Sequence, residues 1–85
     1  MIDKSLYAEL CDSVRAIARI PSELEIDPSS RLVEDLGIDS LDLVSIVLAA
    51  QERYGVAIDE DEVSGLRTMD DLVTFVGRRR QSAAA

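Results

Sequence analysis

The 85-residue sequence contains no histidine, no tryptophan and a single cysteine, Cys11. Without histidine, the chain lacks the commonest general base and the commonest metal ligand of enzymes. One cysteine allows neither an internal disulfide nor a cysteine-ligated zinc site. We therefore expect no catalytic residue and no metal site, and we interpret Cys11 as a half-buried packing residue.

Aromatic and basic residues are also scarce. Two Tyr and one Phe offer no stacking platform for bases, and a net charge of −8 repels nucleic acids and anionic membranes. The longest apolar run covers five residues, 46–50, whereas a membrane span needs about 20. No apolar signal segment follows Met1. We expect a soluble, cytoplasmic, monomeric protein that neither binds nucleic acid nor inserts into membranes.

The acidic residues are concentrated in the middle of the chain. Residues 21–66 carry twelve acids and two bases, whereas residues 67–85 carry two acids and four bases. An acidic surface attracts basic protein surfaces. The functional region is therefore expected within residues 21–66.

Apolar residues at helical spacing predict three longer helices and one short one. The first covers residues 4–19 and ends before Pro21, because the residue preceding a proline avoids the helical region. The second covers 40–54, between an Asp39 cap and Gly55. A short third helix is expected within 59–63, and a fourth begins after Thr68, with Asp71 completing a capping box.

The remaining segments are expected to be a loop and a tail. Residues 21–38 form a long polar loop that apolar side chains pin to the core, namely Ile26, Leu32, Val33 and Leu36. Arg78–Arg80 is read as a solvated helix end, and residues 81–85 as a frayed tail. The predicted fold is all-α, a small four-helix bundle that forms one domain over residues 1–85.

The second helix carries two apolar stripes. With 100° per residue, one stripe holds the residues expected in the core, which are Leu43, Ile46, Val47, Ala50 and Tyr54. Leu41, Val44 and Leu48 form the other stripe, on a different face. One interpretation is an exposed surface for docking a partner, and the alternative is that the long loop covers this stripe.

Ser40 lies at the start of this second stripe. From its position alone, it is either a capping residue or a functional hydroxyl at a helix N-terminus, where anions are favoured. The residues argue against a hydrolase nucleophile, because no histidine is present to activate it and the second glycine of a nucleophile elbow is missing.

The residues around Ser40 resemble the attachment motif of acyl carrier proteins. Residues 36–44 read LGIDSLDLV, which contains the Gly-x-Asp-Ser-Leu signature, and Glu34 and Asp35 upstream are also typical. Downstream, YGVAID at residues 54–59 and TMDDL at residues 68–72 are similar to the family as well. The resemblance covers nearly the whole chain in order.

This resemblance implies that Ser40 receives 4′-phosphopantetheine from coenzyme A through a separate phosphopantetheinyl transferase. Acyl intermediates would then travel as thioesters on the arm, with no catalysis by the chain itself. Asp39 and Leu41 match the residues that the transferase recognises beside the serine. The expected partners also include acyl-chain synthesis or transfer enzymes with basic docking surfaces. The residues expected to contact partners are Glu34, Asp35, Leu41, Asp42, Val44, Leu48 and Glu52.

The sequence departs from many fatty-acid carriers within the second helix. Those carriers place Glu after the motif valine, where this chain has Ser45, and Gln51 and Arg53 reduce the acidity further. Fatty-acid, polyketide and specialised lipid pathways therefore stay open. The alternative function is an unmodified helical interaction module that uses the same acidic and apolar face.

Overall fold

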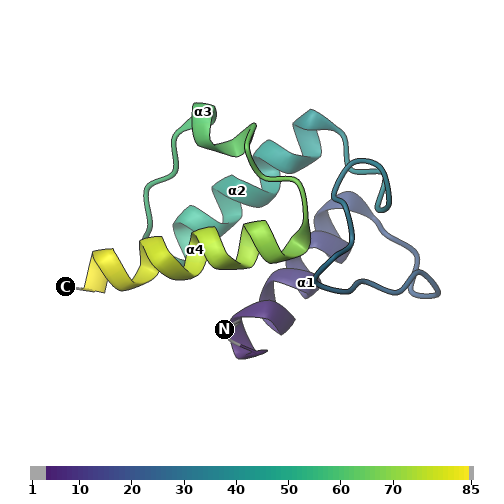
Figure 1. Ribbon diagram of the computed structural model, residues 1–85, viewed down its shortest axis with the longest axis horizontal. Coiled ribbons are helices and arrows are strands. Elements are labelled where there is room, and N and C mark those ends of the chain that lie inside the picture. Colours follow the sequence, from purple (N-terminus) through teal and green to yellow (C-terminus); the bar gives the residue numbers. More distant parts are fainter. Residues whose placement is uncertain (1–3, 85) are drawn as a thin grey trace.

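The computed structural model describes residues 4–84, which form a bundle of four helices. These are α1 (Lys4–Ala18), α2 (Ser40–Tyr54), α3 (Glu60–Val63) and α4 (Met69–Ala84). α1 packs against α2 and α4, and the short α3 packs against α2 (Figure 1). The predicted all-α fold, with three longer helices and one short one, is confirmed.

The ends of α1 and α2 follow from residues in the left-handed backbone region. Arg19, with φ 55°, follows α1, and the Ile20 amide donates to the Arg15 carbonyl over 3.1 Å. This six-to-one hydrogen bond is that of a Schellman motif, and it ends the helix at Ala18, three residues before Pro21. α2 ends at Gly55, with φ 66°, a conformation that glycine adopts without steric cost.

The start of α4 is fixed by the predicted capping box. The Asp71 amide donates to Thr68 Oγ1 over 3.1 Å, and the Thr68 amide donates to Asp71 Oδ2 over 3.2 Å. The helix then continues to Ala84, past the end expected at Arg80. No glycine or proline follows Arg80, and alanine and glutamine favour helix, so helical backbone over residues 81–84 agrees with their composition. Ala85 lies outside the described residues.

The long loop, residues 19–39, is tied to the start of α4 by its backbone. The carbonyls of Pro28 and Ser30 accept hydrogen bonds from the amides of Asp70 and Met69, over 2.9 and 3.0 Å. These amides belong to the first turn of α4, and the amides of a first turn have no acceptor within their own helix. The loop therefore completes one end of the bundle, the end where α2 and α4 begin (Figure 1).

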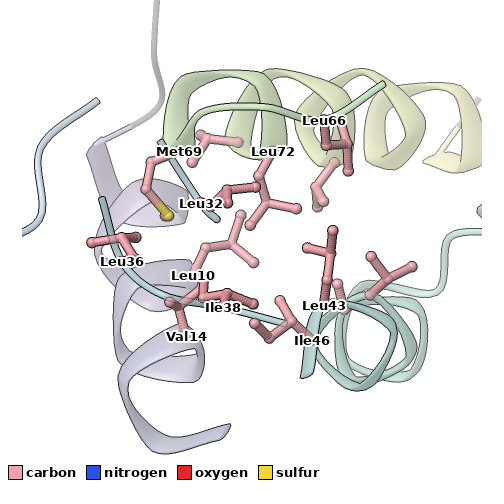
Figure 2. Packing of buried hydrophobic residues seen from close by; sticks show 14 of the residues in the cluster. Leu10, Val14, Leu32, Leu36, Ile38, Leu43, Ile46, Leu66, Met69 and Leu72 are labelled. Atoms are coloured by element: carbon pink, nitrogen blue, oxygen red, sulfur yellow. The ribbon is translucent and has the colours of Figure 1, made fainter. Parts of the chain in front are cut away.

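Several loop side chains enter the core, Ile20 at the start of the loop among them. Leu32, Leu36 and Ile38 are buried together with residues of the helices, as Figure 2 shows. The fully buried members from the helices are Leu6, Leu10, Val14, Ile46, Met69, Leu72, Val73 and Val76. The prediction that Val33 also pins the loop is wrong, because its side chain is 56% exposed. It lies in the tight turn 31–36, whose buried positions are occupied by Leu32 and Leu36.

The arginines near the end of α4 are more than a solvated helix end. Arg79 forms an ion pair with Glu62 of α3 and lies over the Phe75 ring, 5.0 Å from its centroid. Arg80 lies over the Tyr54 ring of α2 at 5.5 Å. These contacts connect α4 to both α2 and α3, and the interpretation of this segment as merely solvated is corrected accordingly.

The two faces of α2 differ sharply in burial. Ile46 and Val47 are 0% and 3% exposed, whereas Leu41 and Leu48 are 78% and 53% exposed. The loop does not cover the second stripe, so the alternative of a buried stripe is wrong.

We therefore expect unequal losses of stability from two neighbouring truncations in α2. Val47→Ala removes two buried methyl groups and leaves a cavity, which costs about 2 kcal/mol, or about 10 °C in melting temperature for a domain of this size. Leu48→Ala removes exposed atoms and should stay within about 0.5 kcal/mol of the parent. Thermal melts followed by circular dichroism measure both; equal losses would contradict the assignment of the two faces.

Candidate functional site

Ser40 is the first residue of α2, and its side chain is exposed. The capping role belongs to Asp39, whose Oδ1 accepts a hydrogen bond from the Asp42 amide over 2.7 Å. Among residues 4–84, no group forms a hydrogen bond with the Ser40 hydroxyl. The interpretation of Ser40 as a cap is therefore wrong, and its hydroxyl is available to a reaction partner.

The three residues before Ser40 hold it at the edge of the core. Gly37 has φ 68°, a left-handed conformation that favours glycine, and its amide donates to the Val33 carbonyl over 3.1 Å. Ile38 is 1% exposed, and its amide donates to the Leu32 carbonyl over 3.0 Å. A buried anchor two residues upstream thus fixes the backbone from which Ser40 projects.

The first turn of α2 suits a phosphate ester on Ser40. The amides of Asp42 and Leu43 donate to Asp39, to its side chain and its carbonyl respectively. Within the described part of the chain, the amides of Ser40 and Leu41 have no acceptor. Unpaired amides and the helix dipole at an N-terminus favour phosphate, so the residues present fit a phosphate-linked group.

The second apolar stripe of α2 begins beside this hydroxyl. Leu41, Val44 and Leu48 are all exposed and recur at spacings of three and four residues, so they share one side of the helix. A continuous exposed stripe of this kind is typical of a protein-binding surface.

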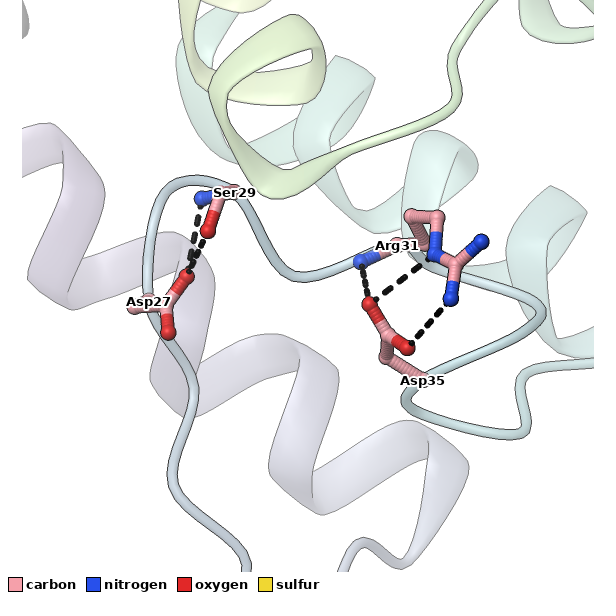
Figure 3. Close-up of polar contacts among 4 residues, drawn as sticks. All are labelled: Asp27, Ser29, Arg31 and Asp35. Carbon is pink, nitrogen blue, oxygen red and sulfur yellow. Dashed lines mark hydrogen bonds and ion pairs between the residues drawn. The ribbon is translucent and has the colours of Figure 1, made fainter.

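The predicted acidic docking residues are of two kinds. Glu34 and Glu52 are exposed and Asp42 is partly buried, and the side chains of these three form no hydrogen bond or ion pair within residues 4–84. Asp35, in contrast, is held by Arg31, as Figure 3 shows. Side-chain and backbone hydrogen bonds from Arg31 hold the pKa of the Asp35 carboxyl below its ordinary value.

The interaction between Arg31 and Asp35 is the feature that sequence reasoning missed. The two residues are four apart and oppositely charged, which is the spacing of a side-chain pair on one helical turn. The spacing alone does not predict the pair, because residues 31–36 form a turn outside any of the four helices. Figure 3 also shows a second local contact of this loop, in which Asp27 Oδ1 accepts hydrogen bonds from the Ser29 amide and hydroxyl.

The other candidate features lie apart from Ser40. Burial raises the pKa of the half-buried Cys11 thiol, which reduces its reactive thiolate form and agrees with a packing role. Residues 4–84 hold no cluster of side chains suited to a metal ion. No helix in that part of the chain has the length and apolar character needed to cross a membrane. A surface hollow of about 370 Å³ is lined by residues of α4 and of the segment before it, and no predicted site residue lines it.

Comparisons with known proteins agree with this geometry. Residues 8–76 match the family model described as phosphopantetheine attachment site. An acyl carrier protein of Acidothermus cellulolyticus is 36% identical over 80 residues, which cover 94% of each chain. A meromycolate extension acyl carrier protein of Mycobacterium leprae is 42% identical over 69 residues, which are 81% of this chain and 56% of that protein.

A solved structure gives the same fold. The crystal structure of an acyl carrier protein from Thermotoga maritima superposes with a TM-score of 0.81 at 24% identity, covering 94% of this chain and 92% of the other. The resemblance found in the sequence is thereby confirmed. The chain belongs to the acyl carrier protein family, whose prosthetic group is phosphopantetheine.

Proposed function

We propose that this protein carries acyl intermediates as thioesters on a 4′-phosphopantetheine arm attached to Ser40. The observation that supports this proposal most directly is the exposed Ser40 hydroxyl at the start of α2, which has no hydrogen-bond partner within residues 4–84 and lies in the Gly-x-Asp-Ser-Leu motif. When bound, the group supplies a thiol on a flexible arm, which raises the effective concentration of the cargo at a docked enzyme.

The residues beside Ser40 have distinct roles in this proposal. Asp39 caps α2 and thereby keeps the Ser40 backbone in place without using its hydroxyl. Leu41, with an exposed fraction of 78%, offers an apolar contact next to the attachment point. Both residues would be read by a phosphopantetheinyl transferase, which must approach this end of α2 to reach the hydroxyl.

Enzymes that use the cargo would dock on the same side. Leu41, Val44 and Leu48 supply the apolar centre of the surface, and Glu34, Asp42 and Glu52 supply unpaired carboxylates at or near it. Basic residues on the partner would pair with these carboxylates and guide the encounter, since charge complementarity acts mainly on the association rate.

The pathway is proposed to be lipid or polyketide assembly. The carriers of the family that match this chain include general acyl carrier proteins and meromycolate extension carriers. Ser45, Gln51 and Arg53 lower the acidity of α2. This composition favours a dedicated set of partner enzymes over the partners of a strongly acidic fatty-acid carrier.

Modification is expected at Ser40 and at no other residue. Incubation with coenzyme A and a broad-specificity transferase should add one phosphopantetheine to the parent protein, as measured by intact-mass spectrometry. Ser40→Ala should remove this mass gain and leave the melting temperature unchanged, because Asp39 is the cap. Asp39→Ala is the matched control for folding and should cost about 1 kcal/mol.

The outcomes separate the proposed carrier from the alternative, an unmodified interaction module. A mass gain that survives in Ser40→Ala would show that another residue is the attachment point. A parent protein that stays unmodified with an active transferase, while a control carrier is modified, would favour the interaction module.

The exposed stripe should matter for partners more than for folding. Leu48→Ala should slow transfer by a partner enzyme while the melting temperature stays near that of the parent, because the side chain is 53% exposed. The acidic residues of the docking surface should make transfer depend on salt. The transfer rate of the parent should fall as the salt concentration rises, since salt screens exposed charges. A rate that is independent of salt would mean that the apolar stripe alone carries docking.

A further inference from the structure

The turn just before the attachment motif contains an unusually complete ion pair. The Arg31 amide and Nε donate to Asp35 Oδ2 over 2.8 and 3.2 Å, and a terminal nitrogen of Arg31 donates to Asp35 Oδ1 over 3.1 Å. Both carboxylate oxygens are therefore occupied (Figure 3). The turn is also closed by its backbone, because the amides of Asp35 and Leu36 donate to the Arg31 carbonyl.

This pair changes the charge pattern beside Ser40. Of the acidic residues nearest to Ser40 in the sequence, Glu34, Asp39 and Asp42 form no ion pair within residues 4–84, and Glu34 has only a weaker electrostatic interaction with Arg31. Asp35 is neutralised by Arg31, and the Arg31 side chain is itself 58% exposed. The hydrogen bond from the Ile38 amide to the Leu32 carbonyl holds this turn next to the attachment motif. An approaching protein therefore meets a charge-neutral pair with an exposed guanidinium there, in place of a free carboxylate.

We propose that Arg31 is a specificity-determining residue that slows docking of partner enzymes whose contact surface is uniformly basic. A fitting partner has basic residues opposite Glu34 and Asp42 and a neutral or acidic group opposite Arg31. Specificity of this kind arises from a repulsive element that disfavours other partners. The proposal rests on the proposed carrier function, because it concerns the surface around the attachment point.

The structure offers variants that separate charge from turn geometry. Arg31→Gln removes the cation but retains the backbone amide that donates to Asp35. Arg31→Lys keeps the charge and loses the forked geometry. Asp35→Asn has the opposite effect on charge, because it leaves the Arg31 cation uncompensated. Arg78→Gln is the matched control, because Arg78 is exposed and belongs to the second half of α4. The C-terminal end of α4 lies at the opposite end of the bundle from the start of α2 (Figure 1).

The experiment measures kcat/KM for Ser40 modification with coenzyme A and a transferase whose carrier-binding surface is basic. At about 0.1 M salt the screening length is about 10 Å, so only nearby charges act on the encounter. Arg31→Gln should raise kcat/KM about 1.5- to 5-fold, the range that one exposed charge contributes. Arg31→Lys and Arg78→Gln should stay near the parent value, and Asp35→Asn should lower it. At about 1 M salt all variants should agree.

Two results would overturn the proposal while leaving the carrier function intact. One is an Arg31→Gln rate equal to that of Arg78→Gln at about 0.1 M salt. The other is a change in the same direction for Arg31→Gln and Asp35→Asn, which would show that the pair acts through the shape of the turn. If the parent protein is not modified at all, the carrier function itself fails, and this inference fails with it.

Discussion

The burial of Leu32, Leu36 and Ile38, in the part of the loop next to α2, is the constraint on which the site depends. A loop of this length has many conformations, and ordering it costs entropy that apolar burial must offset. Leu32 and Leu36 lie within the turn 31–36, and Ile38 lies two residues before Ser40. Backbone hydrogen bonds from the start of α4 to Pro28 and Ser30 fix the other half of the loop. The position of Ser40 therefore depends on the packing of the core, although Ser40 itself is exposed.

Stability and recognition are assigned to different side chains of α2. Ile46 and Val47 face the core, whereas Leu41 and Leu48 face outward on the same helix. The same division holds at the helix start, where the Asp39 side chain accepts the hydrogen bond of the cap and the adjacent Ser40 hydroxyl has no hydrogen-bond partner within residues 4–84. Residues that contact partners can therefore change without much loss of folding free energy, which suits a small domain with a modest core.

Periodicity and end signals were enough to predict most of the fold. The spacing of Leu6, Leu10 and Val14 predicted α1, and the Thr68 and Asp71 pair predicted the start of α4. These signals are local, so the sequence contains them directly. The site motif was recognisable for the same reason, since residues 36–44 are contiguous.

The errors concern interactions that depend on how the chain folds back on itself. Val33 is apolar and adjacent to Leu32, so composition alone could not show that the turn directs it outward. The contacts of Arg79 with Glu62 and of Arg80 with Tyr54 join different helices, and their sequence separation carries no periodic signal. Few basic residues are present, and the three ion pairs among residues 4–84 each use an arginine, at positions 31, 53 and 79. The contacts of those arginines decide which carboxylates stay available to a partner protein. The recognition surface is therefore set by contacts within the folded chain as much as by net charge.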